Sequence, residues 1–138
     1  MTAYVDSSVL LRIILREPGA LADLPAYDGL VASELIAVEA HRTLDRLRVT
    51  GALTAEEAVE RADAVTVWLE AIDLVLLRPV ILARAGDPLP TPLGTLDAIH
   101  LATALVWRER KEEPLVVATH DAALAASARA FKFDVVGI

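Results

Sequence analysis

The sequence predicts one α/β domain built on a mostly parallel β-sheet of about five strands. Short apolar segments of strand type alternate with longer segments of helical periodicity along the whole chain. The 138 residues are 55% apolar but only 4% aromatic, which is enough for one core of mainly aliphatic side chains. No internal repeat or linker divides the chain, so we predict a single domain over residues 1–138.

Five segments have the length and composition of strands. They are Thr2–Val5, Gly29–Ala32, Asp73–Leu77, Leu115–Ala118 and Asp134–Val136. The first stops at Asp6, and the β-branched run of the fourth stops at Thr119. Polar residues therefore follow directly after two of the predicted strands.

Five segments have helical patterns. They are Ser7–Arg16, Ser33–Val49, Thr54–Ile72, Thr95–Lys111 and Asp121–Phe131. Thr54 and Glu57 have the spacing of a capping box, in which each side chain bonds to a free backbone N–H. Thr95–Lys111 is apolar almost all round, which predicts a buried helix. The proline-rich Asp87–Thr95 is expected to be an extended surface loop.

Composition also bears on the compartment and the partners. The absence of cysteine excludes disulfides and thiolate metal sites and favours a reducing cytoplasm. We see no signal peptide and no apolar run near the ~20 residues of a membrane helix, so a soluble cytoplasmic protein is expected. The net charge of −7 argues by itself against a nucleic-acid ligand.

Four acidic residues stand where an α/β fold places its sites. Ligands of open parallel sheets bind beyond the carboxyl ends of the strands. Asp6 ends the first predicted strand, and Asp121 closely follows the fourth. Asp97 lies in the first turn of the apolar helix, and Glu39 lies at the edge of an apolar helical stripe. All four are able to converge at one edge of the sheet.

Each acid also has a purely structural interpretation. Asp6 and Asp121 are placed to cap helices, Asp97 to offset a helix dipole, and Glu39 to pair with Arg42 on the surface. Converging carboxylates, however, repel one another unless cations lie between them. Oxygen ligands favour Mg²⁺ or Mn²⁺, and such ions promote phosphodiester hydrolysis by activating water.

The histidines do not suggest a different metal, because His41, His100 and His120 show no paired ligand spacing. We interpret His100 as a buried structural residue, with orientation of a carboxylate or contact with substrate as the alternatives. Trp68 and Trp107 lie in apolar helical runs and are interpreted as core or dimer contacts.

Four segments in order along the chain resemble the PIN-domain family, and within it the VapC-type toxins of bacterial toxin–antitoxin pairs. They are Tyr4–Leu10, Ser33–Glu39, Thr95–Ala104 and Thr119–Asp121. The resemblance implies a three-layer α/β/α fold, a Mg²⁺- or Mn²⁺-dependent endoribonuclease, a homodimer and a VapB-type antitoxin. It also implies an RNA substrate.

Site residues follow from the same resemblance. Asp6 and Asp97 match the main metal ligands, Glu39 a further ligand, and Asp121 a more variable fourth acid. The small hydroxyl positions beside the acids, which support water or metal, are matched by Ser7 and Thr119.

The sequence departs from the family in one loop and in its acidity. Gly94 occupies a neighbourhood where many relatives carry a basic residue, which puts phosphate contact from that loop in doubt. Bound cations would cancel the charge of the four acids, so RNA needs only a local basic rim. The arginines on helices next to Asp6 and Glu39 are weak candidates for it: Arg12, Arg16, Arg42 and Arg46.

Other functions remain open from the residues alone. A PIN-like nuclease for RNA processing or for DNA would share the catalytic core, and a catalytically silent binding module would keep the fold. A phosphatase with an Asp-x-Asp start is disfavoured because Ser8 replaces the second acid. The apolar segment Ser7–Leu15 could offer a groove to a partner helix.

Overall fold

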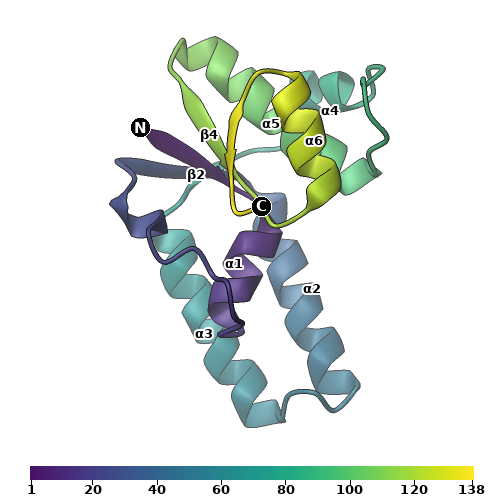
Figure 1. Cartoon of the computed structure of the whole chain (residues 1–138). Helices are drawn as coiled ribbons and strands as arrows, with labels where there is room; N and C mark the ends of the chain where they lie inside the picture. The colour runs from purple at the N-terminus through teal and green to yellow at the C-terminus, as the bar shows by residue number, and fades with distance from the viewer.

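The computed structural model describes all residues from 1 to 138, and its strands form one five-stranded sheet (Figure 1). The strands are β1 (Thr2–Val5), β2 (Gly29–Ser33), β3 (Asp73–Val75), β4 (Leu115–Ala118) and β5 (Asp134–Val136). Their spatial order is β3-β2-β1-β4-β5, and every neighbouring pair is parallel. The predicted parallel sheet is confirmed, with β3 ending two residues earlier than expected and β2 one residue later.

Six α-helices and one short 3-10 helix connect the strands, and none of them is long and apolar enough to cross a membrane. They are α1 (Ser7–Ile14), η1 (Leu24–Ala26), α2 (Leu35–Val49), α3 (Ala55–Glu70), α4 (Pro79–Ala85), α5 (Thr95–Lys111) and α6 (Ala122–Ala130). Helix α4 and the short helix η1 were not predicted from the sequence. Both are short and carry a proline in the first turn. Proline is tolerated at that position of a helix, but in a sequence it is equally typical of a segment that is not helical.

The helices cover both faces of the sheet, which confirms the three-layer α/β/α arrangement (Figure 1). Alternate residues of a strand point to opposite faces. Ala3 and Val5 accordingly pack in the core formed with α1, α2 and α3, whereas Tyr4 packs in the core formed with α5 and α6. Ile81 of α4 packs against α5 on that second side.

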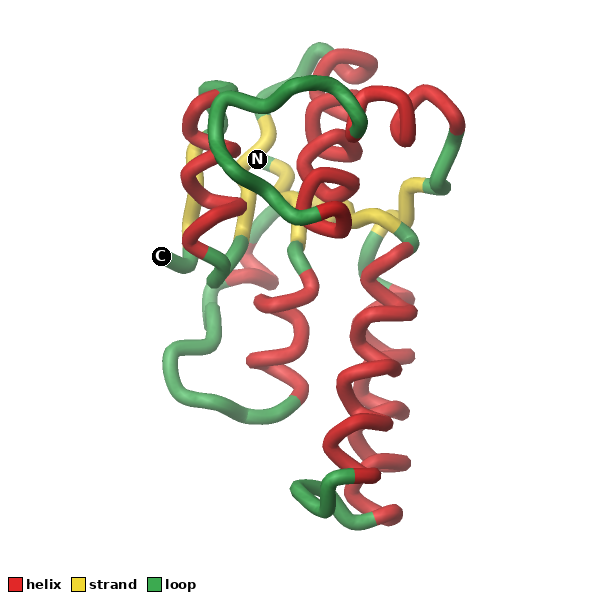
Figure 2. Tube along the Cα trace, turned by 90° about the vertical axis from the view of Figure 1, so that its right-hand side faces the viewer, coloured by secondary structure: helices red, strands yellow, loops and turns green.

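Helices α2 and α3 form a long antiparallel pair that projects beyond the sheet (Figure 2). The predicted capping box starts α3: the Thr54 hydroxyl accepts the Glu57 N–H at 3.0 Å, and the Thr54 N–H donates to the Glu57 carboxylate at 3.1 Å. The apolar side chains of α1 pack into the core or are half-buried against it. Because Val9, Leu10 and Ile14 are buried while Leu11, Ile13 and Leu15 are half-buried, a groove for a partner helix on this segment stays a prediction.

The strand order reverses at β1, because the chain runs from β1 to β2 and β3 on one side and later places β4 and β5 on the other. Such a reversal opens a crevice at the carboxyl ends of the two central strands. Asp6 follows β1 and Thr119 follows β4 at this point, and the Asp6 N–H donates to the Ala118 carbonyl at 3.1 Å. The fold thus brings the ends of two distant segments together.

Candidate active site

Asp6 is buried at the strand ends, with 2% of its surface exposed. It precedes α1 in the N-cap position, yet its side chain makes no capping hydrogen bond. Its Oδ2 instead accepts hydrogen bonds from the Ser8 hydroxyl at 2.7 Å and the Thr119 hydroxyl at 2.8 Å. Its Oδ1 lies 3.9 Å from the His100 Nε2. A buried carboxylate held by side-chain donors is better explained by a site than by a cap.

Two of the hydroxyls around Asp6 were predicted, and one was missed. Thr119 is fully buried and bonds directly to the acid, whereas the Ser7 hydroxyl is 3.5 Å from Asp6 and 3.3 Å from Glu39. Ser8 makes the shorter contact and also accepts the His120 N–H at 3.0 Å. Its position two residues after a strand-end acid, in the first helical turn, is the local signal that identifies it.

Glu39 of α2 points to the same region. Its Oε1 lies 2.5 Å from the Nε2 of His100, its Oε2 accepts from Ser7, and 18% of its side chain is exposed. The surface pairing with Arg42 that we considered is absent, because Arg42 donates to Asp45 at 3.1 Å instead. Glu39 thus belongs to the buried polar network of the site.

His100 is fully buried between Tyr4 and Glu39. Burial lowers the pKa of His100, but the hydrogen bond to Glu39 and the charges of Glu39, Asp6 and Asp97 outweigh burial and raise the pKa above its ordinary value. The buried placement agrees with the structural interpretation, and the contact with Glu39 agrees with orientation of a carboxylate.

Asp97 lies in the first turn of α5 and is half-buried. Its pKa is raised to about 6, first by burial and then by the negative charges of Asp121 and Asp6, with a smaller contribution from Glu39. The charge of His100 acts in the opposite direction. Asp97 therefore experiences the field of all three other acids, which indicates that the four lie around one region.

Asp121 follows β4 and caps α6, because its Oδ1 accepts the Leu124 N–H at 2.8 Å. The capping role considered from the sequence is therefore present. Its own N–H donates to the Thr119 hydroxyl at 3.0 Å, which links it to the Asp6 network. The capping hydrogen bond uses Oδ1 of Asp121, and the negative charge of this carboxylate still raises the pKa of Asp97.

The chemistry of this donor set fits a hard divalent cation. The acids come from four separate places in the chain and present carboxylate oxygens only, which suit Mg²⁺ or Mn²⁺. In the structure as it stands, no three acidic or histidine side chains are arranged as a ready metal-binding group. The four acids therefore supply the charge and the ligand type for a cation without forming a closed coordination shell.

The four candidate arginines differ in their surroundings. Arg42 is tied to Asp45, and Arg16 lies 3.8 Å from Glu60 on the surface. Arg46 is exposed one helical turn beyond Arg42, and Arg12 is half-buried in the last turn of α1. None of them contacts the four acids through a hydrogen bond or ion pair in the structure, so a role at the rim stays a prediction.

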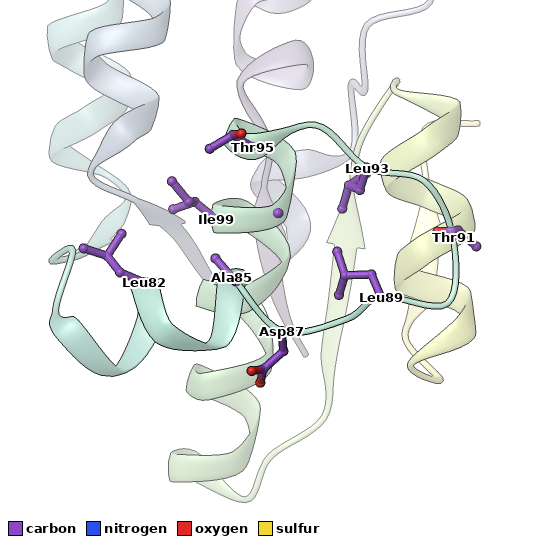
Figure 3. Close-up of a pocket in the computed structure, with 10 residues that line it drawn as sticks. Leu82, Ala85, Asp87, Leu89, Thr91, Leu93, Thr95 and Ile99 are labelled. Atoms are coloured by element: carbon purple, nitrogen blue, oxygen red, sulfur yellow. The ribbon is translucent and has the colours of Figure 1, made fainter.

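A cavity of about 540 Å³ lies beside α5 but contains none of the four acids (Figure 3). Apolar side chains of α4, the 86–94 loop and α5 line it, including Leu82, Leu89, Leu93 and Ile99. Leu89 and Leu93 are half-buried, so the predicted surface loop folds back over the core. No cationic side chain lines this cavity, so it does not suit a phosphate. The four carboxylates are the better candidate for the active site.

A parallel sheet with clustered acids at its switch point is the arrangement of a PIN-type nuclease. The sequence profile of the PIN domain matches residues 3–130, and the chain belongs to this family. It is also 36% identical over 104 residues to the ribonuclease VapC46 of Mycobacterium tuberculosis, covering 73% of this chain and 72% of that protein. Within the PIN-domain family, the chain is therefore a VapC-type ribonuclease, which confirms the resemblance seen in the sequence.

Solved structures show the same fold at low sequence identity. One is a toxin–antitoxin complex from Klebsiella pneumoniae, with a TM-score of 0.66 and 15% identity, covering 99% of this chain and 98% of that chain. Another is VapBC2 from Rickettsia felis bound to a promoter DNA fragment, with a TM-score of 0.68, 12% identity and the same coverage. These similarities confirm the predicted α/β architecture.

Proposed function

We propose that this protein is a Mg²⁺- or Mn²⁺-dependent endoribonuclease that acts as the toxin of a VapBC-type pair. The observation that carries the proposal is the grouping of four carboxylates at the switch point of the sheet, where Asp97 has a pKa raised to about 6. Burial and mutual repulsion make such a cluster unfavourable without a cation. Membership of the VapC-type ribonucleases supports the same chemistry.

The proposed ligand roles are those that the resemblance to the PIN-domain family implies for the matching acids. Asp6 and Asp97 are the main metal ligands, with Glu39 and Asp121 as further ligands. The hydroxyls of Ser8 and Thr119 hold Oδ2 of Asp6, and Oδ1 lies 3.5 Å from the Ser7 hydroxyl and 3.9 Å from Nε2 of His100.

A bound divalent cation supplies activation of water and charge stabilisation at the phosphodiester. The protein's own contribution is to orient its carboxylates in a partly buried site. A phosphate of RNA approaches these acids favourably only when their charge is neutralised. We assign the RNA-binding rim to the arginines predicted from the sequence: Arg12, Arg16, Arg42 and Arg46.

The proposed partners are an RNA, a VapB-type antitoxin and a second copy of the chain. The solved relatives of this fold include complexes of toxins with antitoxins, which supports an antitoxin partner. We place the protein in the cytoplasm, in agreement with its lack of cysteine. Light scattering of the purified chain, alone and with the product of an adjacent antitoxin gene, tests the stoichiometry.

The test of the proposed activity is cleavage of a mixed pool of structured and single-stranded RNA by antitoxin-free protein with Mg²⁺ or Mn²⁺. Reactions with EDTA and reactions of Asp6→Asn are the controls. We expect cleavage only when both the metal and Asp6 are present. Equal cleavage by the wild type and by both Asp6→Asn and Asp97→Asn, at matched metal concentration, would refute the site assignment.

A further inference from the structure

Tyr4, His100 and Glu39 form a buried chain of hydrogen bonds that ends at the carboxylate cluster. The Tyr4 hydroxyl lies 2.6 Å from Nδ1 of His100, and Nε2 of His100 lies 2.5 Å from Oε1 of Glu39. The Tyr4 and His100 rings meet edge to face, with centroids 5.9 Å apart. Both side chains are at most 1% exposed, so neither reaches a bound RNA directly.

The hydrogen atoms of this chain can be assigned from its donors and acceptors. The Tyr4 oxygen accepts the backbone N–H of Ser33 at 3.2 Å, and a phenol, whose ordinary pKa is about 10, carries its single proton at neutral pH. When His100 is neutral, the Tyr4 proton points to Nδ1 and the ring proton is on Nε2. In the imidazolium both nitrogens carry a proton, and Nδ1–H donates to the Tyr4 oxygen instead. In either state Nε2–H donates to Glu39.

This donation fixes one oxygen of Glu39. Oε1 is held by His100, while Oε2 is reached by the Ser7 hydroxyl at the longer distance of 3.3 Å. Glu39 is on α2 and His100 is on α5, and these helices cover opposite faces of the sheet. The bond therefore joins the two helical layers at the strand ends, one turn along α5 from Asp97.

We propose that His100 is a positioning residue for the nuclease reaction: oriented by Tyr4, it holds Glu39 in the direction that the metal-dependent site requires. This inference rests on the proposed function. Groups that orient a metal-binding carboxylate or imidazole typically contribute 10- to 100-fold to metal affinity or activity. His100 acts through Glu39 and does not touch the substrate.

The test compares three variants with a matched control. His100→Leu removes both hydrogen bonds, and Tyr4→Phe removes only the group that orients the ring. His100→Gln keeps an amide that accepts from Tyr4 and donates to Glu39. Ser127→Ala is the control, because it removes a fully buried hydroxyl whose partner is Thr91, outside the carboxylate cluster.

The readouts are the Kd for Mn²⁺, kcat and KM for RNA cleavage, and thermal stability. We expect His100→Leu to lower kcat or Mn²⁺ affinity about 10- to 100-fold. His100→Gln should keep both quantities within about threefold of wild type. The KM for RNA should stay within about twofold of wild type in both His100 variants. Ser127→Ala should lower stability only. Loss of stability in His100→Leu with kcat and Mn²⁺ affinity no lower than in Ser127→Ala would overturn the proposal.

A second measurement needs neither metal nor RNA. Long-range ¹H–¹⁵N NMR of the metal-free wild type should show a proton on Nε2 of His100, and Tyr4→Phe should keep it there, because the Glu39 carboxylate still accepts it. A wild-type ring protonated on Nδ1 alone would overturn the positioning role. A wild type that neither binds Mn²⁺ nor cleaves RNA would contradict the proposed function, and the NMR result would still decide whether His100 donates to Glu39.

Discussion

Replacing Asp97 by asparagine should stabilise the metal-free protein at neutral pH while abolishing its activity. The pKa of this acid moves from 3.8 to about 6, which corresponds to about 3 kcal/mol at 1.36 kcal/mol per unit. Asp97 is only half-buried, so solvent screening reduces this to about 1–2 kcal/mol. Its favourable position in the first turn of α5 offsets about 0.3–1 kcal/mol. The net expected gain is about 1 kcal/mol.

The pH dependence has a definite sign. Because the pKa of Asp97 is raised on folding, the folded state binds more protons than the unfolded state between about pH 4 and pH 6. The contribution of Asp97 to stability therefore falls as the pH rises through this window. The advantage of Asp97→Asn should be small at pH 4.5 and complete by pH 7.5.

Thermal unfolding in EDTA at these two pH values measures the effect. A gain of about 1 kcal/mol corresponds to a Tm higher by about 3 °C for a chain of this length. Saturating Mn²⁺ should reverse the order, because ligand at 100 times its Kd stabilises the wild type by about 2.7 kcal/mol. A lower Tm for Asp97→Asn than for wild type in EDTA at pH 7.5 would show that Asp97 is a structural helix-start residue.

Three further substitutions test separate parts of the account. At Gly94 (φ −69°) a Cβ has no neighbour within 4 Å, so Gly94→Arg should fold normally and lower KM for RNA, with a steeper salt dependence; an unchanged KM would contradict this. At Gly137 (φ +100°) a Cβ would lie 2.4 Å from the Thr119 carbonyl, so Gly137→Ala should lower the free energy of unfolding by about 1–3 kcal/mol in urea. Thr54→Ala removes the capping box of α3, so it should lower Tm by about 3 °C and leave kcat unchanged. A lower kcat would implicate the antiparallel pair of α2 and α3 in catalysis.

The parts of the site that depend on strand ends were predictable. Asp6 and Thr119 each follow an apolar β-rich segment, and parallel strands bring such ends to one edge. Glu39 was identified from its position at the border of an apolar stripe, but its hydrogen-bond partners were not predicted. Its hydrogen-bond partner His100 is 61 residues away, and His100 and Tyr4 are separated by 96 residues. Local spacing carries no information on such contacts.

The structural features that were missed have similar causes. Helix α4 is only seven residues long and begins at Pro79, so no periodicity develops within it. The sequence alone could not separate the core-facing side chains of α1 from those available to a partner helix, because it does not show what packs against them. In the structure, Val9, Leu10 and Ile14 are all buried in the core.

The central claim is that the carboxylates at the switch point bind a divalent cation together, and calorimetric titration with Mn²⁺ tests it most directly. Wild type, Asp6→Asn, Asp97→Asn and the Ser127→Ala control are compared at pH 7.5. The account predicts binding in wild type and control, and affinity at least 10-fold lower in both acid variants. The same Kd in all four proteins, or no binding in any of them, would contradict it.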